Sequence, residues 1–396
     1  MKSKNIVFVH GLFGWGPGEL GGLPYWGDAL AQFEGVFNTY WAKCGPISSF
    51  HDRACELFAQ IKGAQVDYGE AHSAAAGHDQ KSRDYSGKPF VQNWSADNPV
   101  ILVGHSAGAQ TCLQLQQLLA GDLWKCGSNA QWVEAIVSIA GVINGSTATY
   151  LAGCDQATGK LKHSPSIFIQ KGLDLLKMIG TEPIIDLYLD QWTHGKTSID
   201  NALFKKINDS NFVNGDDNLA FDLSLQGCCK ANKNFDTQNY TQNCTYYLSI
   251  VTSKTDPLLG RQRPAFLMNP LLQPFALYQG VDDPFGSSLI KPIPDWGAGD
   301  LTLDKWREND GAVSSISQRF PFTAGDHPVG GEGIFGRPAG AIQKGKWYYQ
   351  RAENIVQHRF DHFDVVLGSK INMLDRSVEA AQRNLYRELC TFLRDL

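Results

Sequence analysis

The sequence predicts an α/β fold, with a mostly parallel central sheet covered by helices on both faces. Three continuous apolar runs, at 5–9, 99–104 and 134–140, alternate with helical patterns in the first part of the chain. Strands that are apolar on both sides and separated by helices are typical of parallel sheets buried between helical layers. The fold class follows from this alternation before any motif is considered.

Further elements fit the same alternation. The β-branched and aromatic runs at 36–42 and 245–251 predict two more strands. The segment 52–63 predicts a helix that begins at Asp52 and ends at Gly63, and helical spacing also follows Ser106 and fills 374–396. Between these elements, 141–240 carries acidic and Asn-rich loops, and 257–345 is rich in Pro and Gly with little regular pattern.

Composition and charge narrow the class of protein. Of the 396 residues, 43% are hydrophobic, 11% aromatic and 19% charged, as in folded globular proteins. A net charge of −5 without a dominant basic patch disfavours a nucleic-acid partner. No apolar run approaches the roughly 20 residues of a membrane-spanning helix. The start MKSKNIVFVHG predicts a core strand rather than a signal peptide, so we expect a cytosolic protein or a mature chain without its leader.

The nine cysteines do not form a thiolate zinc motif, because no CxxC pair is present. Cys55 and Cys112 stand in helical apolar patterns and are predicted to be buried thiols. Cys228, Cys229 and Cys244 cluster around a loop, and the sequence leaves open whether one disulfide forms among them.

The most informative motif is Gly104-His105-Ser106-Ala107-Gly108, a G-x-S-x-G pattern. It lies after a buried strand and before a helix, which is where a nucleophilic serine on a tight turn is found. Ser106 would then sit at a helix N-terminus, where the dipole and the unpaired N–H groups favour developing negative charge. The pattern predicts a catalytic serine.

A serine nucleophile needs an oxyanion hole. The N–H of Ala107, next after the serine, is one expected donor, and the second should come from the loop after an early strand. That loop is FVHGLFGWG (8–16), in which the backbone N–H of Leu12 is the expected donor. We expect His10 to hold this loop by hydrogen bonds and not to act as the base.

The catalytic base is expected late in the chain, because acid and base follow the serine in the order acid, histidine in α/β-hydrolases. His362, in RFDHFDVVLG, lies between a polar loop and a strand-like run, which suits a base carried on a loop. His358 is its rival, and His327, followed by proline, is predicted to be a surface residue.

The catalytic acid is expected at Asp310, which precedes a small-residue stretch in WRENDGAVSSIS. Its role would be to hold the imidazole tautomer and to stabilise the imidazolium. The alternatives are Asp295, Asp300 and Asp304, which are expected to be solvated.

Two histidines, His72 and His78, stand among small residues in VDYGEAHSAAAGHD (66–79). A spacing of six does not place them on one helical face, and the stretch offers no apolar core. We therefore expect a loop. From the residues alone the pair is either a metal site or two ordinary loop residues.

Longer strings resemble a known family. They are VHGLFGWGPGELGGLPYWG (9–27), GPISSFHDRACELFAQIKGAQVDYGEAHSAAAGH (45–78), YLDQW (188–192), DDNLAFDLS (216–224), TYYLS (245–249), WRENDG (306–311) and DHFD (361–364). In them the sequence resembles the thermoalkalophilic, zinc-containing bacterial lipases, which are related to the staphylococcal lipases. The resemblance runs almost from end to end and implies a single α/β-hydrolase domain over 1–396. It also implies the same triad of Ser106, Asp310 and His362, with Leu12 and Ala107 as the oxyanion hole.

A structural zinc site is a further implication of the resemblance. Its ligands fall on Asp52, His72, His78 and Asp217, with Asp216 as the alternative to Asp217, in an insertion formed by 45–82 and about 212–226. Four protein ligands close a tetrahedral zinc shell, so the metal would clamp the insertion and leave no water to activate.

The sequence departs from the family at two places. The family's serine motif is usually Ala-His-Ser-Gln-Gly, but a hole made of backbone N–H groups should tolerate the change. The family also carries a calcium site just after the catalytic histidine. Asp364 matches one of its carboxylates, whereas a later acid and proline are replaced by Ser369 and Lys370. Because calcium prefers six or more hard oxygens, we expect this site to be lost or weakened.

The expected function is hydrolysis of acylglycerol esters at a lipid interface by a lipase or carboxylesterase, secreted as in the family. The segment 166–180 carries a wide apolar stripe, which alone predicts a core-facing helix. The resemblance instead implies a lid over about 160–195. The alternatives are a polyester depolymerase or acyltransferase on the same fold, and an inactive lipid-binding homologue.

Overall fold

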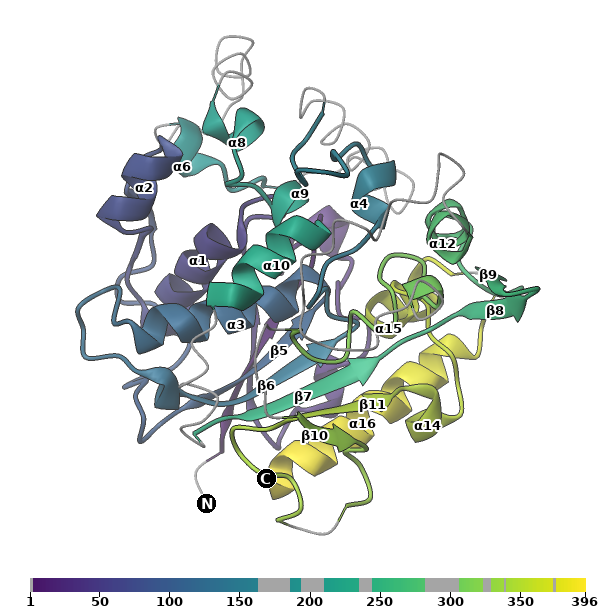
Figure 1. Ribbon diagram of the computed structural model, residues 1–396. Helices are drawn as coiled ribbons and strands as arrows, with labels where there is room; N and C mark the ends of the chain where they lie inside the picture. The colour runs from purple at the N-terminus through teal and green to yellow at the C-terminus, as the bar shows by residue number, and fades with distance from the viewer. Residues whose placement is uncertain are drawn as a thin grey trace.

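The computed structural model describes residues 3–162, 186–193, 210–234, 244–281, 306–322, 329–337, 340–372 and 375–396. Its central element is a seven-stranded sheet (Figure 1). The strand order is β10 (Val329–Glu332), β11 (Trp347–Arg351), β7 (Tyr246–Val251), β6 (Val133–Ile139), β5 (Val100–His105), β1 (Asn5–Val9) and β2 (Asn38–Ala42). Every pairing within it is parallel. The expected mostly parallel sheet with flanking helices is therefore confirmed.

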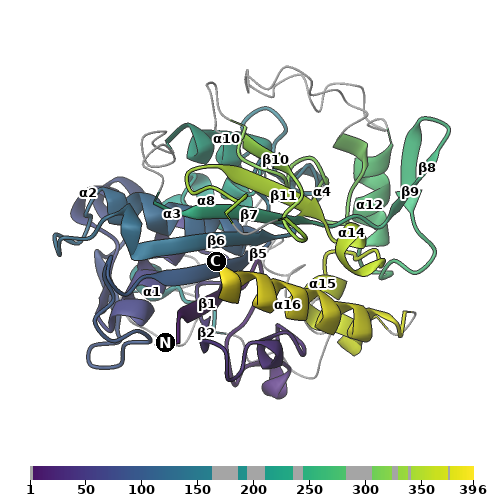
Figure 2. The ribbon, with the colours of Figure 1, turned by 90° about the horizontal axis from the view of Figure 1, so that it is seen from below.

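Helices cover both faces of the sheet, as Figure 2 shows for α3 and α16. The longer helices are α1 (Phe50–Lys62), α3 (Ala107–Ala120), α10 (Leu225–Asn234), α12 (Gln273–Gly280) and α16 (Val378–Asp395). The shorter ones are α2 (Glu70–Ala76), α4 (Ala148–Leu151), α6 (Asp190–Thr193), α8 (Asn211–Asn214), α9 (Leu219–Asp222), α14 (Glu353–Val356) and α15 (Asp364–Leu367). Two hairpins stand outside the sheet, β3 (Gln65–Asp67) with β4 (Lys81–Asp84) and β8 (Thr255–Leu258) with β9 (Arg261–Pro264).

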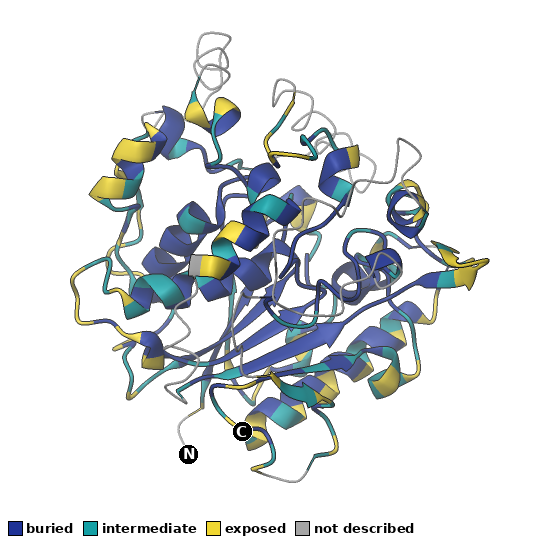
Figure 3. Cartoon of the chain, viewed as in Figure 1, coloured by how far each residue is buried: buried dark blue, intermediate teal, exposed yellow. Residues whose placement is uncertain are grey.

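The inner strands β1, β5, β6 and β7 are buried almost throughout, because alternate side chains enter two different apolar layers (Figure 3). Phe8 of β1 packs in one layer with Leu389 of α16. Its neighbour Val7 packs in the other with Leu57 of α1 and Leu113 of α3. This is why the sequence shows continuous apolar runs rather than an apolar–polar alternation.

Local signals explain where the first helix begins and ends. The side chain of Ser49 accepts a hydrogen bond from the N–H of Asp52 and caps α1, so the helix begins at Phe50, two residues before the predicted start. Gly63 ends it in the left-handed conformation, as predicted.

Several expectations from the sequence need correction. His72 lies within helix α2 and not in a loop; the helix ends at Gly77 in the left-handed conformation, and His78 follows. The stretch 257–345, expected to lack regular structure, contains hairpin β8–β9 and helix α12. The segment 166–180, expected to belong to a lid, lies outside the described residues. Among the described helices, none has both the length and the apolar character to cross a membrane.

The cysteines are buried thiols where the sequence predicted them, at Cys55 and Cys112. Cys228 is also buried, and its thiol donates to the carbonyl oxygens of Val142 (3.2 Å) and Asp222 (3.1 Å). In the described part of the chain, no disulfide forms among Cys228, Cys229 and Cys244.

Candidate active site and metal cluster

Ser106 stands on a strained turn between β5 and α3. Its φ of 56° and ψ of −125° lie where a residue with a side chain is rarely found. Glycine is required on both sides. A Cβ at Gly104 would lie 2.4 Å from the backbone of Gly108 and Ala109, and one at Gly108 would lie 2.1 Å from the carbonyl oxygen of Val9. The close packing of β1, β5 and α3 thus explains the G-x-S-x-G spacing.

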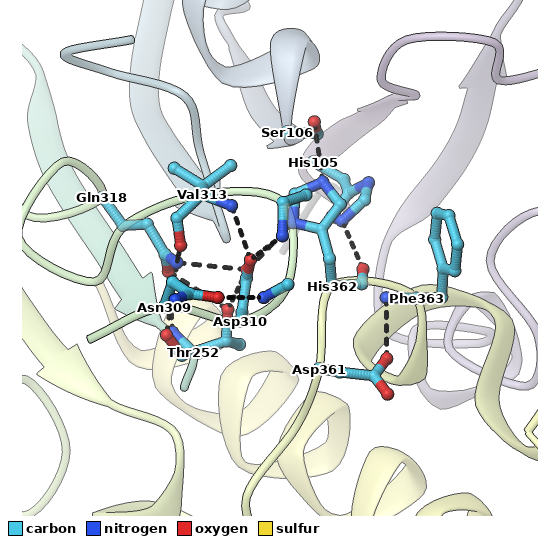
Figure 4. A network of polar contacts seen from close by, with 12 residues as sticks. His105, Ser106, Thr252, Asn309, Asp310, Val313, Gln318, Asp361, His362 and Phe363 are labelled. Carbon is cyan, nitrogen blue, oxygen red and sulfur yellow. Dashed lines mark hydrogen bonds and ion pairs between the residues drawn. The ribbon is translucent and has the colours of Figure 1, made fainter. Parts of the chain in front are cut away.

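A chain of hydrogen bonds links Ser106 to a histidine and an aspartate (Figure 4). His362 Nε2 lies 2.9 Å from Ser106 Oγ, and His362 Nδ1 lies 2.9 Å from Asp310 Oδ2. The backbone N–H of His362 also donates to the carbonyl oxygen of Asp310 at 2.9 Å. The structure therefore brings together the three residues that the sequence analysis selected, although they stand 256 and 52 positions apart.

The carboxylate of Asp310 is fully buried and accepts hydrogen bonds at both oxygens. Oδ1 accepts from the backbone N–H groups of Ala312 (3.0 Å) and Val313 (2.8 Å). Besides the histidine, Oδ2 accepts from Thr252 Oγ1 (2.7 Å) and Gln318 Nε2 (3.1 Å), as Figure 4 shows. These donors compensate the burial of a negative charge. Thr252 and Gln318 were missed by the sequence analysis, because nothing local marks residues that meet only in the fold.

The rival candidates are elsewhere or undescribed. His358 Nε2 lies 3.6 Å from Asp375, away from the hydrogen-bonded chain of Ser106. Four other candidates lie outside the described residues, namely His327, Asp295, Asp300 and Asp304.

The loop after β1 lies directly against the serine. A Cβ at Gly11 would stand 2.6 Å from Ser106 Cβ, and Leu12 packs in the same apolar cluster as Ala107. His10 Nε2 accepts the N–H of Cys44 (3.2 Å), and its Nδ1–H donates to the carbonyl oxygen of Gly11 (2.9 Å). Burial, and then the charge of Arg53, lower the pKa of His10 to about 3, so it is a neutral ring that holds the loop.

A second buried imidazole joins this loop to the histidine loop. The N–H of Gly11 donates to Tyr25 Oη (2.9 Å), and the hydroxyl of Tyr25 donates to His105 Nδ1 (2.6 Å). The Nε2–H of His105 then donates to the carbonyl oxygen of His362 (3.1 Å). Burial and the neighbouring His362 hold the pKa of His105 well below its ordinary value, which keeps the ring neutral. No local signal in the sequence marks this connection between three loops.

A second polar cluster lies at α1, α2 and the residues before α9. One ligand atom from each of Asp52, His72, His78 and Asp217 falls within 4.8 Å of the others. His72 Nε2 lies 3.1 Å from Asp52 and 3.5 Å from Asp217; His78 Nε2 lies 3.7 Å and 3.4 Å from the same two carboxylates. Ligands at about 2.0–2.1 Å from a tetrahedral zinc ion would stand roughly 3.3 Å apart, so the spacing fits one ion.

The hydrogen bonds around the cluster leave metal-facing atoms without a partner. Among the described residues, His78 Nε2 and Asp217 Oδ2 are buried and have no hydrogen-bond partner. The other nitrogen of His78 donates to the carbonyl oxygen of Asp79 (2.8 Å), which turns the lone pair of Nε2 toward the cluster. Gln191 Nε2 similarly holds Asp52 Oδ2 at 2.8 Å. The donor set and its surroundings are compatible with a bound metal.

The cluster also resolves which of two adjacent aspartates belongs to it. Asp216 points to Lys230, whose ammonium lies 2.7 Å away at the surface, and Asp217 faces the histidines. Burial would lower the pKa of His72, but Asp217 and Asp52 outweigh it and raise that pKa to about 10. The two carboxylates thus make the cluster attractive to positive charge.

Asp364 meets an ammonium group. Its Oδ2 lies 2.5 Å from Lys254 Nζ, and its Oδ1 accepts from Asn372 Nδ2 at 2.9 Å. This is the carboxylate for which the family resemblance implies a calcium ligand.

A family model described as "Lipase-like, C-terminal domain" matches residues 2–394, and the chain belongs to this lipase-like family. Lipase 1 of Staphylococcus aureus is 29% identical over 392 residues, which are 91% of this chain and 50% of that protein. The chain thus spans about half the length of the curated relatives it matches. Among solved structures, EstA from Clostridium botulinum superimposes with a TM-score of 0.72, 29% identity and coverage of 100% of this chain and 88% of that one. Lipase 1 from Pelosinus fermentans superimposes with a TM-score of 0.67 and 28% identity, and the match covers 97% of this chain and 98% of that one.

The close packing at the serine turn makes a testable prediction. Gly108→Ala should lower the free energy of unfolding by about 2 kcal/mol or more, because its Cβ would overlap the carbonyl oxygen of Val9. Gly121→Ala is the matched control, since its φ is −81° and no atom lies closer than 3.6 Å to the added carbon. The control should change stability by no more than about 0.5 kcal/mol in urea unfolding. Equal stability of the two variants would contradict the packing described.

Proposed function

We propose that the protein is a serine ester hydrolase, a lipase or carboxylesterase that cleaves the esters of acylglycerols. The observation that carries the proposal is the hydrogen-bonded chain from Ser106 through His362 to the buried Asp310. The serine stands on a strand–turn–helix elbow in a mostly parallel sheet, as in α/β-hydrolases. The lipase names of the relatives support the same class of reaction.

The roles follow from the geometry. His362 Nε2 takes the proton of Ser106 Oγ as that oxygen attacks the carbonyl carbon of the ester. As the new C–O bond forms, the electrons of the C=O double bond move onto the carbonyl oxygen, which becomes an oxyanion. The N–H groups of Leu12 and Ala107 hold this oxyanion. His362 then protonates the departing alcohol. In the second half, water loses a proton to His362 and attacks the acyl carbon. The bond from that carbon to Ser106 Oγ then breaks, Oγ takes the proton back from His362, and the acid leaves.

Asp310 keeps His362 in the tautomer that this sequence needs. Its carboxylate accepts the Nδ1–H, so Nε2 carries the lone pair that faces the serine. When His362 becomes an imidazolium, the buried negative charge stabilises it without having to reorganise, because four other donors already fix the carboxylate.

We also propose that the cluster of Asp52, His72, His78 and Asp217 holds zinc. Imidazole nitrogen and carboxylate oxygen are ligands that zinc takes in tetrahedral sites, and four protein ligands make such a site structural. When bound, the ion would supply a cross-link between helix α1, the α2 segment and the chain before α9. The orphaned atoms of His78 and Asp217 support this proposal.

The role of Ser106 as the nucleophile makes a testable prediction. Ser106→Ala should reduce kcat/KM on nitrophenyl acyl esters at least about 10⁴-fold while the fold persists, because the nucleophile is lost and only binding and the oxyanion hole remain. A fluorophosphonate should label the wild type but not this variant. The exposed Ser86→Ala is the control and should behave as the wild type in both assays. Undiminished turnover by Ser106→Ala would exclude the mechanism.

Comparing acyl-chain lengths with and without a competing alcohol separates ester hydrolysis from acyl transfer.

The zinc proposal is tested by two adjacent aspartates. The wild type should contain about one zinc ion per chain. Asp217→Asn should lower this zinc content by more than half, because it weakens one of four ligands, whereas Asp216→Asn should leave the zinc content unchanged. The loss should lower the free energy of unfolding by at least about 2 kcal/mol, as expected when a tight native-state ligand is removed. Metal analysis and thermal unfolding measure the two effects. The proposal fails if metal-depleted wild type is as stable as the untreated protein, or if Asp217→Asn retains its metal.

A further inference from the structure

Lys254 is a buried cation directly behind the histidine loop. Only 3% of the residue is exposed, and its ammonium lies 2.5 Å from Asp364 Oδ2 and 3.1 Å from Asp375 Oδ2. Both carboxylates stand at hydrogen-bond distance from the ammonium and compensate its charge. The side chain therefore stays charged in the interior, where an uncompensated charge would be costly.

The carboxylates around this ammonium organise the backbone next to His362. Asp361, immediately before the histidine, accepts the N–H groups of Phe363 (3.1 Å) and Asp364 (3.0 Å) at one oxygen; Figure 4 shows the first of these. Its other oxygen accepts the N–H of Asn269 at 2.8 Å. Asp364, two residues after the histidine, takes the ammonium itself. His362 thus stands between two aspartates of the cluster.

The other end of Lys254 reaches the acid loop. Its backbone N–H donates to the carbonyl oxygen of Asn309 at 3.1 Å, and Asn309 immediately precedes Asp310. Two residues before Lys254, the hydroxyl of Thr252 donates to the Asp310 carboxylate at 2.7 Å. One short segment after β7 therefore connects the loop of the acid to the loop of the base.

We propose that Lys254 is a positioning residue whose ammonium is a built-in cation, holding the His362 loop in register with Asp310 without a bound divalent ion. The inference rests on the proposed ester hydrolysis. Two carboxylates in direct contact with one buried ammonium form an ion cluster made only of the chain's own side chains, and Asp361 stands on the same loop as Asp364. The side chain stands against the very carboxylate, Asp364, at which the family resemblance implies calcium. An ammonium there fills the position with one charge and three N–H donors.

The test removes the ammonium of Lys254 by substitution and then offers calcium ions in solution as a replacement cation. Lys254→Met keeps most of the volume of the side chain and should lower kcat on a soluble nitrophenyl ester by about 10- to 100-fold, with KM within about twofold, because the base is misplaced while the binding surface is kept. Lys254→Ala leaves room for a hydrated ion. Millimolar calcium should raise its kcat by at least about fivefold, since calcium accepts such carboxylates at that concentration. The kcat of the wild type should not respond to calcium.

Controls separate positioning from general stability. Lys4→Met removes a surface lysine that pairs with Glu134 at 3.0 Å, and it should change neither kcat nor the calcium response. Calcium is added to calcium-free buffer and no chelator is used, because a chelator would also strip the Asp52 cluster. Asp375→Asn replaces the carboxylate by an amide of the same size and leaves the pair of Lys254 and Asp364 in place. It should lower kcat by a smaller factor of about two to ten. This variant tests the ammonium cluster if Lys254→Met fails to fold.

A Lys254→Met enzyme that melts earlier but keeps its kcat would overturn the inference, as would a Lys254→Ala enzyme whose lost kcat calcium does not restore. If Lys254→Met does not fold, an unchanged kcat in Asp375→Asn would overturn it as well. A wild type that hydrolyses no ester would instead contradict the proposed function.

Discussion

The buried carboxylate of Asp310 is the group on which the rest of the site depends. A negative charge without contact to solvent is tolerated only if donors surround it. Here the donors come from separate parts of the chain: Thr252 after β7, the turn at Ala312 and Val313, Gln318, and His362. Satisfying one charge therefore fixes several loops at once, and the position of the imidazole opposite Ser106 follows from it.

The sheet determines that these loops can meet. In a parallel sheet the carboxyl ends of neighbouring strands lie at one edge, where α/β proteins place their sites. Ser106 follows strand β5. Strand β7 is two places away from β5 in the sheet, with β6 between them, and Thr252 is the first residue after β7. Loop Gly11–Leu12 follows β1 on the other side of β5. The elements with strong local signals thus carry the groups whose contacts are long-range.

Two charged clusters flank this edge and work by the same principle. On one side, two carboxylates face two imidazoles in a geometry that fits a metal ion. On the other, carboxylates face the ammonium of Lys254. In both, groups of opposite charge join segments that are far apart in the sequence, and each cluster is satisfied only when all its members are in place. The chain would thus use an external cation at one cluster and its own cation at the other.

The sequence predicts the structure best where the signal is local. Continuous apolar runs located β1, β5 and β6 within a residue or two, and the flanking glycines located Ser106. Asp310 and His362 were chosen by order and context, and the cluster of Asp52, His72, His78 and Asp217 came from family resemblance. Helix α2 was missed because a run of alanines between two glycines carries no apolar period. Tyr25, Thr252, Gln318 and Lys254 were missed because their roles arise only from contacts that folding creates.

The most direct test of the account is a crystal structure of the protein after reaction with an alkyl phosphonate that mimics the tetrahedral intermediate. We expect a covalent bond between phosphorus and Ser106 Oγ, with the phosphoryl oxygen within about 3 Å of the N–H groups of both Leu12 and Ala107. His362 should remain hydrogen-bonded to Asp310. Phosphorus attached to another residue, or a phosphoryl oxygen turned away from both N–H groups, would contradict it.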